Sequence, residues 1–106
     1  MNNVEINREE LTLVRVYLTE EEAHLKTLLK RLHDWELVRG VTVFRGIAGF
    51  GDSGTIHESS LVDMSLNLPV VIEFFEQADK AEEVIEYLYQ EIGPGHIVSW
   101  PVQLST

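Results

Sequence analysis

The chain of 106 residues has no cysteine, and it has no long apolar run. Without cysteine there is no disulfide, no thiolate nucleophile and no cysteine zinc site. No run approaches the roughly eighteen apolar residues of a membrane span, and the first residues lack the basic and apolar regions of a secretory signal. These absences predict a cytoplasmic protein with no segment inserted in a membrane.

Positive charge is also scarce. The chain has 18 acidic residues against 8 basic ones, which gives a formal net charge of −10. The basic residues are spread along the sequence and form no cluster. Because a surface of this charge repels phosphate backbones and anionic lipid, we expect no nucleic-acid partner.

What the chain does have is enough apolar sequence for one small domain. Its 44% apolar content supports one modest core and is too little for two domains. Residues 1–10 are polar and acidic, which predicts a loose N-terminal lead. Residues 11–104 are then expected to form a single domain.

Two helices are indicated by capping signals followed by apolar residues at helical spacing. Thr19 and Glu22 have the spacing of a capping box, and the helix after them is expected to run about five turns to the break at Arg39-Gly40. Asp79 is expected to cap the second helix, which Gly93-Pro94 ends. The apolar stripes are Leu25, Leu28, Leu29, Leu32 and Trp35 in the first helix, and Ala81, Val84, Ile85, Leu88 and Ile92 in the second.

Strands are predicted at residues 11–18, 41–48, 59–66, 70–75 and 97–104, the last at a sheet edge because it contains a proline. Right-handed crossovers put both helices on the same face of one antiparallel sheet. The expected fold is therefore α+β and ferredoxin-like, in the order βαββαβ.

Such a fold leaves one face of the sheet uncovered by helices. Large apolar residues on the strands are too many to stay exposed on a small domain, and contiguous apolar patches usually mark an association surface. Self-association is therefore predicted from five aromatic residues: Tyr17, Phe44, Phe74, Phe75 and Trp100.

A glycine-rich stretch follows the second main strand. Gly46, Gly49, Gly51 and Gly54 lie within nine residues, where they mark the end of strand pairing and the start of a mobile loop. A loop held by a rigid sheet often carries function, and its glycines would let backbone amides approach a ligand beside Phe50. The alternative is a plain flexible connection within a hairpin.

No catalytic or metal constellation can be placed. Asp52, Ser53 and His57 are triad residue types, but they lie close together on one loop without a rigid scaffold. His24 and His33 lack the i, i+4 spacing of a helical metal pair. We therefore expect neither an enzyme nor a metal site.

Three motifs together resemble the PII-like signalling proteins, in the branch long filed as a domain of unknown function. They are Arg45-Gly-Ile-Ala-Gly-Phe-Gly51, Asn67-Leu-Pro-Val-Val-Ile-Glu73 and Gly93-Pro-Gly-His-Ile97. Each motif is weak alone, but the three occur at the right places in the element order. The resemblance covers about residues 11–104.

This resemblance implies a homotrimer whose sheets face inward and whose long T-loop lies at about residues 49–60. It also implies that a small effector, commonly an adenine nucleotide, binds between subunits, and that the T-loop docks on a partner protein such as a membrane transporter, a channel or an enzyme. The ligand residues so implied are Gly49, Phe50, Gly51, Asp52, Ser53, Gly93, Gly95 and His96. The T-loop residues expected to contact the partner are Gly54, Thr55, His57 and Glu58.

The chain departs from the nucleotide-binding pattern of that family at its cations. Where ATP-binding relatives carry basic residues, this chain has Asp52, Ser53 and His96, and its last strand has no cation. Charge-assisted phosphate contacts contribute ~1.5–3 kcal/mol each, so their loss favours AMP, ADP or a cyclic nucleotide over ATP. Arg45 is the one cation near the loop and is a further candidate contact.

A second function class stays open at this point. Divalent-cation-tolerance proteins share this fold, and four histidines with an acidic surface would suit a trimeric metal-binding protein. The glycine loop and the Gly93-Pro-Gly-His96 turn favour the effector-binding sensor. His57 and His96 also have plain structural readings, as a solvated loop residue and as a turn residue.

Overall fold

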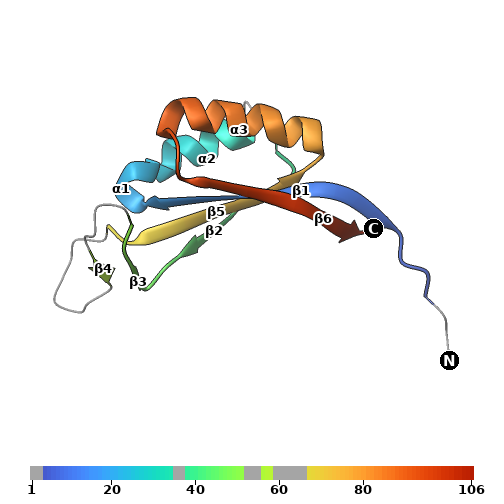
Figure 1. The fold of residues 1–106 in the computed structure, drawn as a ribbon, viewed down its shortest axis with the longest axis horizontal. Coiled ribbons are helices and arrows are strands. Elements are labelled where there is room, and N and C mark those ends of the chain that lie inside the picture. The colour runs from blue at the N-terminus through green and yellow to red at the C-terminus, as the bar shows by residue number, and fades with distance from the viewer. Residues whose placement is uncertain (1–3, 35–37, 52–55, 59–66) are drawn as a thin grey trace.

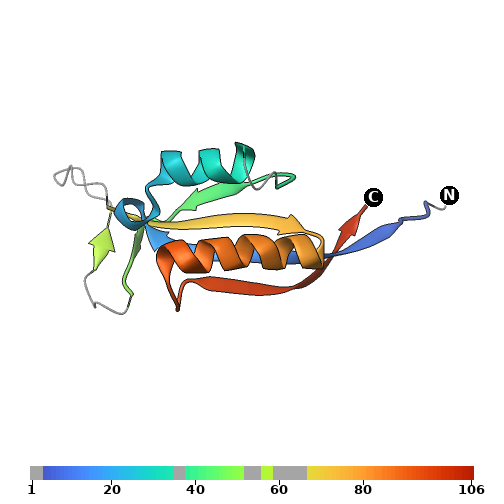
Figure 2. The ribbon, with the colours of Figure 1, turned by 90° about the horizontal axis from the view of Figure 1, so that it is seen from above.

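The computed structural model describes residues 4–34, 38–51, 56–58 and 67–106. Two long helices lie side by side over one face of a sheet, and a small hairpin projects from one end of it (Figures 1 and 2). The elements in chain order are β1 (Arg8–Thr19), α1 (Glu20–Ala23), α2 (Leu25–Asp34), β2 (Thr42–Arg45), β3 (Ala48–Gly49), β4 (His57–Glu58), β5 (Pro69–Glu76), α3 (Ala78–Ile92) and β6 (Ile97–Ser105).

The main sheet has four strands in the order β2-β5-β1-β6, and every neighbouring pair is antiparallel. This is the strand order of a ferredoxin-like sheet, so the predicted fold class is confirmed. Strands β3 and β4 form a separate two-stranded hairpin. Strand β6 lies at a sheet edge, as the proline at position 101 predicted.

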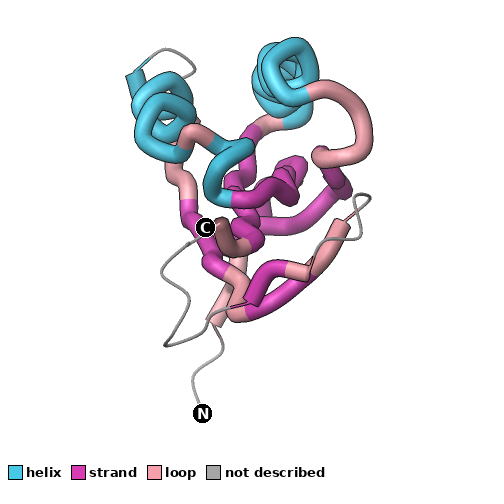
Figure 3. The backbone as a smooth tube through the Cα atoms, turned by 90° about the vertical axis from the view of Figure 1, so that its left-hand side faces the viewer, coloured by secondary structure: helices cyan, strands magenta, loops and turns pink. Residues whose placement is uncertain are grey.

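The core lies between the sheet and the helices, as the end-on view of the backbone shows (Figure 3). Alternate residues of β1 and β5 point into it, because side chains in a strand alternate between the two faces. The strands contribute Val14, Val16, Leu18, Val70, Ile72 and Phe74. The helices contribute Ala23, Leu28, Leu32, Ala81, Val84 and Leu88 to the buried core, and Leu25, Ile85 and Ile92 are partly buried against it. Both predicted stripes thus face the core, except that Leu29 is only half-buried and lies outside this cluster.

The opposite face of the sheet carries no helix. We call this surface the bare face. Strand alternation and the pairing register place on it Leu13, Tyr17, Phe44, Val71, Phe75 and Trp100. Tyr17, Phe44 and Trp100 are exposed. Phe74 was expected there, but it is 1% exposed within the core. That expectation is wrong because Phe74 alternates with Phe75 and so faces the helices.

The first predicted helix is interrupted. Thr19 and Glu22 form the capping box as expected, but α1 ends at His24, whose φ of 43° is left-handed. The His24 carbonyl then accepts hydrogen bonds from Thr27 and Leu28, which starts α2 in a new direction. The break keeps α1 on the sheet end, where the Glu20 and Glu21 amides bond to the chain just before β5.

The second helix begins earlier than its predicted cap. Gln77 is the N-cap residue and makes no side-chain capping bond. Asp79 therefore lies inside the first turn, where its Oδ1 accepts a hydrogen bond from the Lys80 amide at 3.0 Å. The prediction that Asp79 caps α3 is wrong, although its charge still suits the helix dipole. Gly93 ends the helix as predicted, with its amide bonded to the Tyr89 carbonyl at 2.8 Å.

Other element bounds differ from their predictions at the ends. Strand β1 begins at Arg8 and pairs there with Ser105, so three residues of the predicted lead belong to a strand. The predicted strand 41–48 is divided, because pairing with β5 stops at Arg45 and β3 turns away. The predicted strand 59–66 and the predicted core residue Trp35 lie outside the described residues.

At the end of the sheet farthest from the hairpin, acidic side chains bind Arg39. Glu76 is 7% exposed, and its Oε1 accepts a hydrogen bond from the Arg39 amide at 2.6 Å. The Arg39 guanidinium also pairs with Glu9 across 3.4 Å, and the hydrogen bond to Glu9 is the main reason why the pKa of Arg39 is raised. These contacts fix the segment that leads into β2.

The break at His24 gives a stability prediction. A left-handed backbone costs a non-glycine residue ~1–2 kcal/mol, so His24→Gly should leave the free energy of unfolding unchanged or raise it by up to ~1 kcal/mol. Lys30→Gly is the matched control, because Lys30 is exposed within α2 and should lose ~1 kcal/mol. Urea unfolding of both variants tests this, and equal losses in the two would contradict the strained turn.

Candidate functional site

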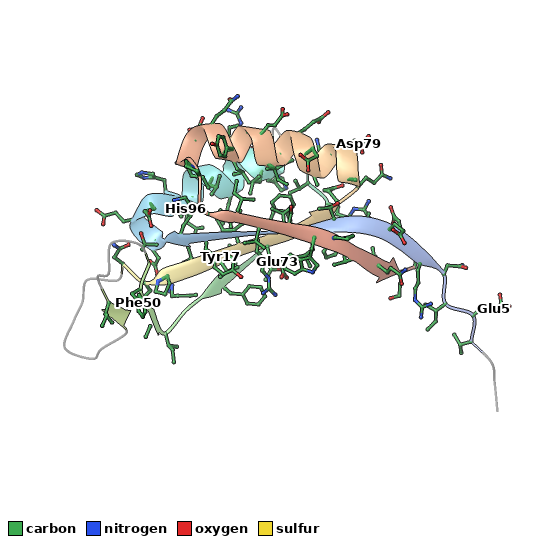
Figure 4. The ribbon with its side chains drawn as sticks, viewed as in Figure 1. Glu5, Tyr17, Phe50, Glu73, Asp79 and His96 are labelled. Atoms are coloured by element: carbon green, nitrogen blue, oxygen red, sulfur yellow. The ribbon has the colours of Figure 1, made fainter. Side chains whose placement is uncertain are left out.

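The two parts of the predicted site lie at the same end of the molecule. The glycine-rich segment follows β2 and forms the β3–β4 hairpin, and the Gly93–His96 turn connects α3 with β6. Figure 4 shows Phe50 on the hairpin and His96 at the start of β6. Of the sequence-predicted residues, Asp52, Ser53, Gly54 and Thr55 lie outside the described residues, and the side chains of His57 and Glu58 are not described.

The turn after α3 needs glycine for its backbone angles. Gly93 has a φ of 81° and Gly95 a φ of 89°, both in the region that disfavours side chains. A Cβ at either position would meet nothing within 4 Å. The turn therefore holds its shape by glycine and leaves open space on its surface, which suits a loop that another molecule approaches.

His96 is held in one orientation by its own turn. Its Nδ1 lies 2.9 Å from the Tyr17 carbonyl oxygen, and the Tyr17 amide donates to the His96 carbonyl at 2.9 Å. Because a carbonyl oxygen only accepts, Nδ1 must carry the proton. The remaining atom, Nε2, is then an acceptor on neutral imidazole and a donor on imidazolium. His96 can therefore hold an anion through Nε2 when it is protonated.

The hairpin base is packed against a proline. A Cβ on Gly46 would lie 2.8 Å from the Pro69 Cγ, and one on Gly49 would lie 3.2 Å from it. The Gly46 amide also donates to the Pro69 carbonyl at 2.7 Å. These two glycines are required by the close approach of Pro69, a reason that the sequence did not reveal.

Gly51 differs from these two glycines. A Cβ there would meet nothing within 4 Å, and its φ is not in the left-handed region. The described residues therefore give no steric reason for glycine at position 51. Its expected ligand role stays a prediction.

The hairpin carries exposed apolar side chains. Phe50 is 75% exposed, Ile47 just before β3 is 83% exposed, and Ile56 just before β4 is 68% exposed. Phe50 was predicted as an exposed apolar surface, but Ile47 and Ile56 were missed. The signal that could have found them is an isolated large apolar residue within a glycine-rich polar loop, where no core is available to bury it.

Arg45 does not stand free beside the hairpin. Its Nε forms an ion pair with Glu20 Oε1 at 2.5 Å. That oxygen is buried and accepts no well-aligned hydrogen bond from the described residues. The pair ties the end of β2 to the start of α1. An anionic ligand would have to displace Glu20 to use this cation, which weakens Arg45 as a phosphate contact.

The two halves of the site start from opposite edges of the sheet. The hairpin continues from β2, His96 precedes β6, and these strands are the two edges of the sheet. The hairpin then leaves this sheet, and its Gly49 packs on Pro69 at the start of the inner strand β5.

Other features of the described residues do not coincide with this region. Two shallow hollows of about 320 and 490 Å³ lie around Arg39, Gly40 and Val41, at the other end of the sheet. Among the described residues, no group of three or more histidine and acidic side chains could hold a metal ion. No helix in the same ranges is long and apolar enough to cross a membrane.

Known structures place this fold among the PII-like proteins. CPII from Thiomonas intermedia K12, solved with ADP and bicarbonate, superposes with a TM-score of 0.73 at 19% identity, over 96% of this chain and 95% of that one. A chain from Thermus thermophilus, described as a PII-like signalling protein, gives 0.64 at 14% identity, over 94% and 92%. The class defined by the fold is thus PII-like, which confirms the resemblance seen in the sequence.

The family follows from the sequence comparisons. Residues 11–104 match the DUF190 model, described as uncharacterized ACR, COG1993, and the chain belongs to this family. A UPF0166 protein of Aquifex aeolicus (strain VF5) is 34% identical over 79 residues, covering 70% of this chain and 74% of that protein. The UPF0166 protein MJ1524 of Methanocaldococcus jannaschii is 32% identical over 88 residues, covering 76% and 77%.

The packing of Pro69 on the hairpin base gives a direct test. Gly46→Ala should lower the free energy of unfolding by ~1–3 kcal/mol, because the added methyl group meets a rigid ring at 2.8 Å. Gly51→Ala is the control and should change it by less than ~0.5 kcal/mol, because nothing lies within 4 Å.

A Pro69→Ala background refines this measurement. Removing the ring should reduce the cost of Gly46→Ala, since the two substitutions share one contact. Chemical denaturation of the four chains completes the double-mutant cycle. Additive losses would show that Pro69 is not the obstacle.

Proposed function

We propose that this protein is a PII-like sensor that does not act as an enzyme. It binds a small effector, an adenine nucleotide, between the subunits of a homotrimer in the cytoplasm. Effector binding then alters a T-loop at about residues 49–60, and the T-loop regulates a partner protein. The single domain of this sensor is residues 11–104.

The observation that carries this proposal is the position of His96. A left-handed glycine turn presents an imidazole whose Nδ1 is fixed by the Tyr17 carbonyl at 2.9 Å, which leaves Nε2 for a ligand. The hairpin glycines lie at the same end of the molecule, on a hairpin that leaves the main sheet after β2. A neighbouring copy can bring its hairpin to this turn, and the exposed bare face supports association with such a copy.

Ligands of structurally similar proteins support the nucleotide class. The Thiomonas intermedia CPII was solved with ADP and bicarbonate, and also with ADP, AMP and bicarbonate. In the present chain the ligand residues would be Gly49, Phe50, Gly51, Asp52, Ser53, Gly93, Gly95 and His96. The backbone amides of the glycines would serve as donors to one phosphate or a small anion.

The charges near the turn and the hairpin favour a ligand with few phosphates. Arg45 is engaged by Glu20, and β6 has no lysine or arginine. His96 supplies at most one positive charge, and only when protonated. AMP, ADP or a cyclic nucleotide therefore fits this site better than ATP.

The exposed apolar hairpin supports a role in docking on a protein. Ile47, Phe50 and Ile56 are exposed on a projecting element whose base is fixed by Pro69. The proposed partner contacts from the T-loop are Gly54, Thr55, His57 and Glu58, and the target is a transporter, a channel or an enzyme. The metal-binding alternative has no comparable support among the described residues.

The first prediction from this proposal is the oligomeric state. Light scattering after size exclusion should give three times the chain mass of 12.1 kDa, because the apolar bare face needs cover. The measurement should be made at micromolar concentration and at moderate salt. A stable monomer there would remove the basis for an intersubunit site.

The second prediction concerns ligand preference. Calorimetry without added metal should show AMP or ADP binding tighter than ATP, because each added phosphate brings charge that few cations can match. Gly95→Ala should weaken this binding by straining the turn, since the φ of 89° costs alanine ~1–2 kcal/mol. Tighter binding of ATP than of AMP would refute the argument from the missing cations.

A related prediction tests the imidazole itself. His96→Ala should weaken nucleotide binding, because it removes the imidazole that the turn holds through Nδ1 and whose Nε2 is left for a ligand. His33→Ala is the control, since His33 is exposed on α2 and pairs with Asp34. Unchanged nucleotide binding by His96→Ala would mean that this imidazole does not contact the ligand.

A further inference from the structure

The bare face is mainly apolar and carries one ion pair near its centre. Arg15 on β1 lies directly opposite Glu73 on β5, and Arg15 Nε is 2.7 Å from Glu73 Oε1. Figure 4 places Glu73 on the side of the sheet away from the helices. From Leu11 to Tyr17 on β1, and along the other three strands β2, β5 and β6, no other bare-face position holds a charged residue.

The pair is held in place by its aromatic neighbours. The Arg15 guanidinium carbon lies 5.6 Å from the centre of the Trp100 ring. The pKa of Arg15 is raised, first by its hydrogen bond with Glu73 and then by one with Tyr17. The Arg15 side chain is 40% exposed and that of Glu73 is 19% exposed. Both charges are thus fixed, yet they still face outward enough to meet another surface.

The chemistry of this pair restricts what can cover the bare face. A guanidinium has five N–H donors, more than Glu73 and Tyr17 can occupy. A purely apolar partner would strip water from the remaining donors and leave them unpaired, at a cost in free energy. A partner suited to the face must therefore bring both an apolar surface and a carboxylate to the same place.

A second copy of this chain brings that combination. We propose that, where two copies meet through the bare face, the Arg15–Glu73 pair of one copy interlocks with that of its neighbour and fixes the register of the assembly. The proposal rests on the self-association proposed above and names the polar contact that makes it selective. Like-charged or purely apolar surfaces are then disfavoured as partners.

The test uses two variants whose bare faces carry opposite charges. Arg15→Glu makes an acidic pair and Glu73→Arg a basic pair, so each variant alone should dissociate at micromolar concentration. Mixed together, the acidic and basic copies should associate more strongly than either alone, as seen by light scattering and by native mass spectrometry with one copy tagged. A trimer of two copies of one kind and one of the other has one like-charged contact in place of three. An ion pair that acts only within a chain would leave the mixture dissociated, which would overturn the proposal.

Matched controls separate the effect of a charge change on the bare face from the effect of a change in net charge. Lys30→Glu and Glu83→Arg make the same charge changes on exposed helix positions, and both variants should remain assembled. The doubly reversed chain, Arg15→Glu with Glu73→Arg, should also assemble. Should a reversed variant fail to fold by circular dichroism, Arg15→Gln and Glu73→Gln replace it, each expected to weaken association at least ~tenfold, and unchanged association overturns the proposal.

The outcomes distinguish this inference from the proposed function. If the wild-type chain is a monomer, both fail, because no copy is present to complete the site. If the wild-type chain assembles and the reversed variants assemble equally well, only the role of Arg15 and Glu73 is overturned. Nucleotide binding by the assembled chain would then still support the sensor.

Discussion

The alternation of side chains along β1 is the constraint on which the rest of the structure depends. This strand lies between β5 and β6, so its register fixes both neighbours. Val14 and Val16 then face the helices, while Arg15 and Tyr17 face away from them. A shift by one residue would exchange the two sets and place Arg15 in the core, which explains why one register is strongly preferred.

The helices cover one face of the sheet. The other face has no such cover within the described residues. Two stripes on α2 and α3 are enough to bury one side of a four-strand sheet, and there is no third long helix among the described residues. Exposed Phe44 and Trp100 therefore remain on the bare face, with the Arg15–Glu73 pair between them. An isolated ion pair in an apolar surface contributes little to folding but much to the choice of partner.

The fold could be predicted because its signals are repeated along the chain. The stripes of α2 and α3, the capping box at Thr19 and the glycine stop at Gly93 all appear in the sequence as periodic or local patterns. The break at His24 could not be predicted, because no glycine marks it and the contacts of α1 that accompany it come from the chain before β5, far away in the sequence. Long-range contacts of this kind leave no local pattern.

The sequence singled out the residues of the candidate site but not the contacts that hold them. Glycines at positions 46 and 49 suggested a loop near a ligand, yet Pro69, from a later strand, is what requires them. The tautomer of His96 likewise depends on the Tyr17 carbonyl from a strand far away in the sequence. Because Tyr17 also belongs to the bare face, the Gly93–His96 turn and the bare face are connected through β1. A ligand bound between copies would stabilise their association, and association would by the same linkage tighten ligand binding.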